Sequence, residues 1–139
     1  ALVILGLLAG LAVWAQQAPE RLVFEDKEAG KVFLLNPHLG EVDLECLKKN
    51  VKKLCQAIDN HEVTYLKAIY RLDDPEVRQI LSSASIKIQR GGMHTGDAYV
   101  LLDKPSQYFF LQQGQDMFAA GQMPPGVKFN TCWKKPLQD

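Results

Sequence analysis

The chain contains three cysteines, and their spacing limits which disulfides can form. Cys46 and Cys55 lie in a segment with helical periodicity, so they are about 180° apart around the axis and roughly 13 Å apart along it. A disulfide requires Cα atoms within about 7 Å of each other, so these two cannot bond while the helix is intact. Either one can bond Cys132 instead.

The apolar pattern around the cysteines favours one pairing over the other. Cys55 lies in the apolar stripe of the expected helix, whereas Cys46 lies on the side that carries Lys49 and Lys53. We therefore expect a Cys55–Cys132 disulfide, with Cys46–Cys132 as the alternative. Strict alternation along an expected strand at 127–131 points Cys132 outward and favours that alternative. The expected pairing leaves Cys46 as an odd, exposed thiol that can link two chains into a dimer.

No group of residues has the spacing of a catalytic, cofactor or metal site. His38, His61 and His94 are scattered, and a zinc site requires several ligands that converge. The glycine-rich stretch 91–96 lacks the Gly-Lys-Ser/Thr ending of a phosphate-binding loop, so we interpret it as a hairpin loop. We consider three functions, namely binding of a protein partner, transport of a small apolar ligand and catalysis, and catalysis is therefore the least favoured.

Methionine and aromatic residues are dense in the C-terminal third of the chain. They predict an apolar surface that meets an extracellular protein partner, or alternatively the mouth of a cavity that carries a small apolar ligand. The residues that we expect at this surface are Met93, His94, Met117, Phe118 and Met123.

The remaining patterns predict the elements that must position these residues. The chain reads as an α+β fold, a mainly antiparallel sheet with one long amphipathic helix packed on one face and a second short helix. The expected strands are 21–25, 31–35, 63–72, 85–89, 98–102, 107–112 and 127–131, the expected helices are 41–59 and 75–82, and 114–126 is expected to be irregular.

The first fifteen residues are apolar and uncharged, and they resemble a secretory signal peptide that is cut before Gln16. An uncleaved membrane anchor is the alternative interpretation of residues 1–15, although the run is shorter than a spanning helix requires. The rest, 16–139, is long enough for a single domain. Its zero net charge disfavours nucleic acid as a partner, and after cleavage we expect a secreted, extracellular protein that is not attached to a membrane.

Overall fold

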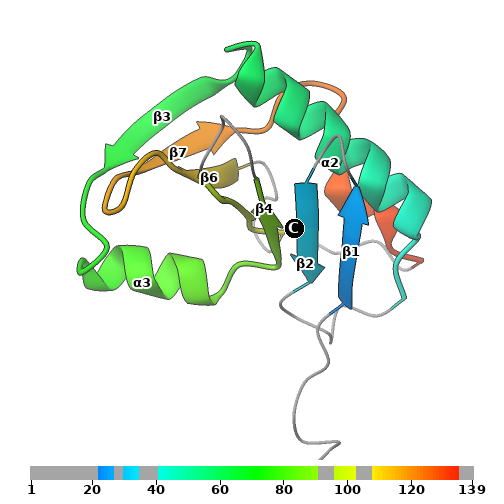
Figure 1. Ribbon diagram of the computed structural model, residues 1–139, viewed down its shortest axis with the longest axis horizontal. Helices are drawn as coiled ribbons and strands as arrows, with labels where there is room; N and C mark the ends of the chain where they lie inside the picture. Colours follow the sequence, from blue (N-terminus) through cyan, green and yellow to red (C-terminus); the bar gives the residue numbers. More distant parts are fainter. Residues whose placement is uncertain (1–21, 27–29, 35–40, 91–95, 103–107, 135–139) are drawn as a thin grey trace, which may run out of the picture.

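The computed structural model describes residues 22–26, 30–34, 41–90, 96–102 and 108–134. In these residues, seven strands form one antiparallel sheet in the order β1-β2-β4-β5-β6-β7-β3 (Figure 1). The strands are β1 (Leu22–Asp26), β2 (Gly30–Leu34), β3 (Thr64–Ile69), β4 (Ile86–Gln89), β5 (Ala98–Val100), β6 (Tyr108–Gln112) and β7 (Phe118–Gln122). The helices are α2 (Leu44–Asp59), α3 (Pro75–Ser82) and a short 3-10 helix, η2 (Phe129–Cys132).

Helix α2 begins at a side-chain cap and carries the chain from one end of the sheet to the other. The carboxylate of Asp43 accepts hydrogen bonds from the backbone N–H groups of Glu45 and Cys46, which have no partner within the helix. Spacings of three and four place Leu47, Val51, Leu54 and Ile58 on one buried stripe, as the sequence predicts. Leu44 has the same spacing, but it lies in the first turn and is 39% exposed.

Helix α3 covers a smaller part of the opposite face. Asp74 caps it by accepting from the N–H of Glu76, and Pro75 occupies the first turn, where its missing N–H costs nothing. Only Val77 of this helix is fully buried. It packs with Ile69 and Phe118, so α3 lies near the β3 and β7 end of the sheet.

The larger part of the core lies between α2 and the sheet. The side chains from the helix contact strand residues that include Ile86, Ile88, Val100 and Phe109, all of which are fully buried. The C-terminal segment closes this core with Val127, Phe129 and Trp133. The predicted α+β fold, with its long helix on one face and its second short helix, is confirmed.

The C-terminal segment differs from the prediction at two elements. The stretch expected to be irregular contains β7, whose Ala119, Ala120 and Gly121 have low strand propensity but fit between two neighbouring strands. A Cβ atom at Gly121 would lie 2.4 Å from the ring of Phe109, so this position requires glycine. The strand expected at 127–131 is wrong: the turn at Gly126, which has a φ of 91°, leads into η2 instead.

No helix within the described ranges is long and apolar enough to cross a membrane. Residues 1–15, and with them the expected signal peptide and its cleavage position, lie outside the described residues.

Candidate functional site

The disulfide joins Cys46 to Cys132, with a Cα–Cα distance of 5.4 Å, so the expected Cys55–Cys132 pairing is wrong. Cys132 lies in η2. The backbone carbonyl of Cys132 accepts a hydrogen bond from the N–H of Asp43, and this bond holds η2 beside the first turn of α2. Cys55 lies more than two turns further along the helix and is buried in the core. Because Cys46 is bonded within its own chain, it is not the odd, exposed thiol on which the expected Cys46-linked dimer depends.

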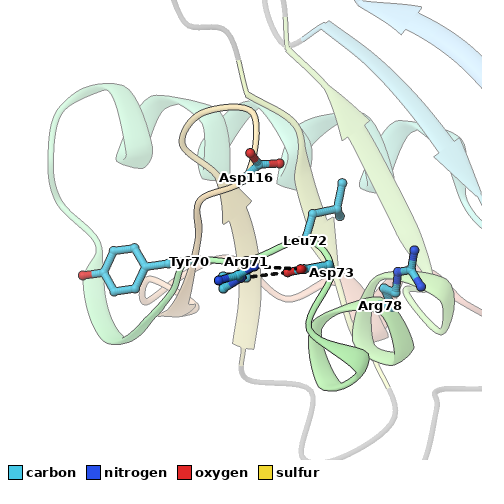
Figure 2. Close-up of a pocket in the computed structure, with 6 residues that line it drawn as sticks. All are labelled: Tyr70, Arg71, Leu72, Asp73, Arg78 and Asp116. Carbon is cyan, nitrogen blue, oxygen red and sulfur yellow. Dashed lines mark hydrogen bonds and ion pairs between the residues drawn. The ribbon is translucent and has the colours of Figure 1, made fainter.

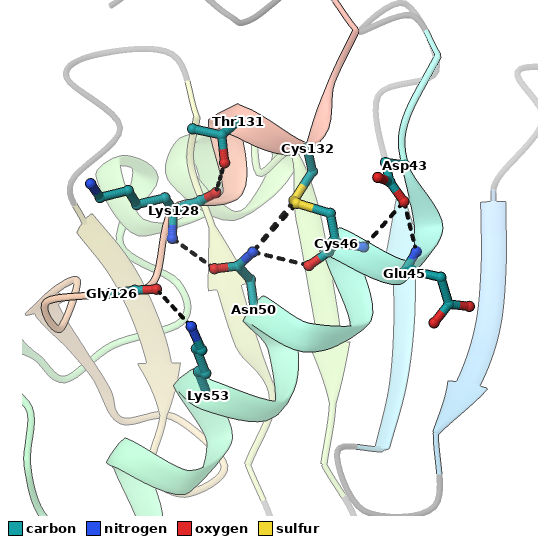
Figure 3. The surroundings of a disulfide bond; sticks show 9 residues. All are labelled: Asp43, Glu45, Cys46, Asn50, Lys53, Gly126, Lys128, Thr131 and Cys132. Atoms are coloured by element: carbon teal, nitrogen blue, oxygen red, sulfur yellow. Dashed lines mark hydrogen bonds between the residues drawn. A yellow bond between two sulfur atoms is a disulfide. The ribbon is translucent and has the colours of Figure 1, made fainter.

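Asn50 holds the segment that contains Cys132 against α2 (Figure 3). Its Nδ2 donates to the carbonyl of Cys46 at 2.9 Å and to the sulfur of Cys132 at 3.4 Å. Its Oδ1 accepts from the N–H of Lys128 at 2.8 Å. The side chain is 7% exposed, and these bonds satisfy both ends of its amide, so the role of Asn50 is structural.

An open hollow of about 510 Å³ lies where the end of β3 meets the start of α3 (Figure 2). The loop after β3 contributes most of its wall, helix α3 contributes one residue, and the turn between β6 and β7 contributes another. Figure 2 shows the ring of Tyr70 pointing away from the other side chains. The lining residues are Tyr70, Arg71, Leu72, Asp73, Arg78 and Asp116.

The charges in this hollow differ in how they are satisfied. Arg71 donates to both carboxylate oxygens of Asp73, at 2.9 and 2.8 Å. This side-chain hydrogen bond raises the pKa of Arg71 and lowers the pKa of Asp73. Within the described part of the chain, Arg78 and Asp116 make neither a hydrogen bond nor an ion pair through their side chains. The hollow therefore offers one cation and one anion to a ligand.

Exposed apolar side chains gather at the same end of the molecule. Tyr65 and Leu66 lie on β3 and are 43% and 52% exposed, while Tyr70 and Leu72 follow that strand at 59% and 41%. Met117 precedes β7, which pairs with β3, and is 40% exposed. Tyr70 and Leu72 line the charged hollow, Met117 follows its Asp116, and Tyr65 and Leu66 lie further along β3.

The structure places only part of the expected binding surface in solvent. Met117 is exposed, but Phe118 and Met123 are 1% and 9% exposed and belong to the two core clusters. They are therefore packing residues, and the expectation that they form a surface is wrong for both. Met93 and His94 lie outside the described residues.

Sequence reasoning missed the residues that line the hollow, although it predicted the helix at 75–82 next to them. Their charges look like an ordinary solvated loop in the sequence, because the hollow exists only where Asp116 approaches from the turn between β6 and β7. One available signal was the density of apolar residues from Tyr65 to Leu72, which exceeds what a strand with a single buried residue requires.

A second polar group lies on the sheet between β4 and β5. Lys87 forms an ion pair with Asp97 at 3.3 Å and lies 5.8 Å from the centre of the Tyr99 ring. Burial raises the pKa of Tyr99, and the nearby charge of Lys87 opposes this effect. These groups satisfy one another across paired strands, so they stabilise the sheet.

In the residues that the structure describes, no three histidine, cysteine or acidic side chains are grouped so that they could hold a metal ion. The arrangement that remains is a charged hollow next to exposed aromatic and aliphatic side chains, which suits the recognition of another molecule. Comparison with known proteins gives this chain no relative: no family model matches it, and neither a curated protein nor a solved structure does.

Proposed function

We propose that this chain is a secreted interaction protein that binds an extracellular protein partner at the hollow beside α3. The observation that carries this proposal is that Arg78 and Asp116 lie among exposed apolar residues at one end of the sheet, and that neither side chain makes a hydrogen bond or an ion pair with the described residues, although each lies close enough to act electrostatically on the Arg71–Asp73 pair. Protein interfaces combine such apolar anchors with a polar rim, and arginine and tyrosine are enriched in them.

The composition of the hollow favours a protein partner over a small apolar ligand. Four of its six lining residues are charged, namely Arg71, Asp73, Arg78 and Asp116. An apolar ligand in this position would remove water from these groups without replacing their hydrogen bonds, which costs free energy. A protein surface can supply the matching carboxylate for Arg78 and the matching ammonium or guanidinium group for Asp116.

The disulfide supports the extracellular part of this proposal. Bonds of this kind form and persist in oxidising compartments and are rare in the reducing cytosol. The Cys46–Cys132 bond joins residues 86 positions apart, so it ties the C-terminal segment to the first helix. Expression in secreting cells, with a methionine added before Ala1, tests this part: secretion should give a protein that begins at Gln16. Retention in the cells, or an intact N-terminus, would contradict it.

Partner capture from extracellular fluid tests the site. The immobilised protein should retain a partner that the double variant R78A/D116A does not retain. The variant E45A/K49A is a matched control, because it removes one acid and one base from exposed positions on α2. A partner that binds R78A/D116A as well as wild type would show that the hollow is not the site. A small apolar molecule that co-purifies, with no protein retained, would favour the carrier instead.

A further inference from the structure

Strand β3 forms one edge of the sheet, and Ile69 is the one residue of this strand in the core cluster that contains α3. It pairs with β7 on one side, and no described strand lies on its other side (Figure 1). Five of its six residues are exposed, and only Ile69 is buried. An edge of this kind presents unpaired N–H and C=O groups that can hydrogen-bond to another extended chain.

Two hydrogen bonds show which residues of β3 present their main chain to this open edge. At the end of β6, the backbone N–H of Gln112 donates to the carbonyl of Asp97, so Gln112 faces β5. The N–H of the next residue, Gln113, donates to the carbonyl of Met117, so Gln113 faces β7. In antiparallel sheets this direction alternates along each strand. Continued through the printed register, the alternation directs Phe118 and Ala120 toward β3.

Their partners on β3 are Ile69 and Lys67, whose main chains therefore face β7. The main chain of Ala68, which lies between these two, must face the open edge. The register shifts between Tyr65 and Lys67, so Leu66 is an extra residue in a bulge. Regular pairing from outside is therefore centred on Ala68, and it ends at the bulge.

We propose that the open edge of β3 binds the same edge of a second copy of this chain, in antiparallel orientation about a twofold axis at Ala68. The two Ala68 residues then exchange both main-chain hydrogen bonds. The side chain of Leu66, at the bulge of each copy, then lies next to Tyr70 of the other copy. These are the two most exposed large apolar residues of the described chain, so the pairing covers both of them twice.

The charges along the edge are compatible with this register. Lys67 lies opposite Ile69 of the second copy, and the guanidinium group of Arg71 is already paired with Asp73 of its own chain. No two like charges face each other directly, and the chain has no net charge that would keep two copies apart. A register moved by one residue toward the N-terminus would instead place the two Lys67 side chains opposite each other.

This dimer would also change the hollow. Tyr70 belongs both to its wall and to the paired segment, so Leu66 of the second copy would extend that wall. One assembly would present two such sites, and a partner with two binding surfaces would then be held by both. The dimer does not depend on the identity of any partner, and it can be tested without one.

Sedimentation equilibrium of the oxidised protein, from low micromolar to high micromolar concentration, tests the proposal. We expect a monomer–dimer equilibrium whose dissociation constant rises at least tenfold in the A68P variant. Proline at this position removes an N–H that faces the open edge, so the ladder to β7 is kept. The control A68S retains that N–H and should dimerise like wild type. A protein that remains monomeric over the whole range would overturn the proposal.

A pair of complementary variants tests the register without requiring the proline variant to fold. The L66K and Y70D chains should each dimerise weakly, because each places a charge against an apolar residue twice. Mixed together, they form a heterodimer with one lysine–aspartate contact and one intact leucine–tyrosine contact, so association should recover at least fivefold over either chain alone. Dimers that neither A68P nor these variants weaken, or a mixture without recovery, would place the interface elsewhere. An extended peptide partner in place of a second copy would leave the free protein monomeric.

Discussion

Removing the disulfide should cost the protein a large part of its stability. The bond closes a separation of 86 residues. In the chain-entropy model, a loop of that length restricts the unfolded state by about 4.6 kcal/mol at 25 °C. Folded domains are typically stable by about 5–15 kcal/mol, so we expect the double variant C46A/C132A to be marginal.

Urea unfolding followed by circular dichroism gives the measurement. With an unfolding slope of about 2 kcal/mol per molar urea, the midpoint should fall by about 2 M in C46A/C132A. Wild type should show a similar fall in a reductant, whereas the double variant should not respond to it. Part of the loss has a local cause, because the Nδ2 of Asn50 donates to the sulfur of Cys132 and loses that acceptor.

The variant C55A is the control, since Cys55 is buried but lies outside the disulfide. It removes a buried sulfur, so we expect a loss of about 1 kcal/mol that is the same with and without reductant. The reasoning is refuted if C55A loses its sensitivity to reductant while C46A/C132A retains it. A loss below about 1 kcal/mol in C46A/C132A would refute the entropic estimate.

Three further predictions concern buried groups. N50L leaves the N–H of Lys128 without its acceptor and should lower the free energy of unfolding in urea by about 1–3 kcal/mol. N50D places a buried carboxyl of raised pKa at the same position, so the loss of stability should be small below pH 4 and grow as pH rises. A loss of stability that is independent of pH would contradict this. G121A drives a methyl group into the ring of Phe109, so it should cost about 1–3 kcal/mol and be partly rescued by F109L; equal losses in G121A with and without F109L would argue against that contact. Burial raises the pKa of Tyr99, so its contribution to stability is present below about pH 10 and lost above it. Y99F should remove the highest-pH part of the tyrosine absorbance titration. A titration that is unchanged in Y99F would refute the assignment.

Local patterns in the sequence were sufficient for most of the fold. The long helix was predicted because apolar residues from Leu47 to Ile58 recur at helical spacing, and the structure confirms it as α2. The helix expected at 75–82 is confirmed as α3, whose start depends on Asp74 and Pro75, two neighbouring residues that the sequence itself shows. Alternation predicted the pairing of β4 with β5, which the structure also confirms.

The errors arise where a contact between distant segments decides the outcome. Strand β7 contains two alanines and a glycine, and it forms because it fits between β6 and β3 under the ring of Phe109. The disulfide was assigned to Cys55 because that residue lies on the apolar stripe. The observed bond depends on where η2 meets the helix, and helical periodicity carries no information about this contact.

The position of the candidate site follows from the order in which the chain builds its sheet. Helix α2 takes the chain from β2 to the other end of the sheet. Strand β3 lies at that end, and it precedes in the sequence β7, the strand that pairs with it. After α3 the chain returns to the middle of the sheet at β4. Strands β5, β6 and β7 then follow one beside the other, and β7 pairs with the inner side of β3. The outer side of β3 is therefore left without a strand, and α3 is too short to cover both this edge and the turn that carries Asp116. Exposed apolar residues there have no role in the core that either helix completes. For this reason we place both recognition at the hollow and self-association at the edge on the β3 side of the molecule.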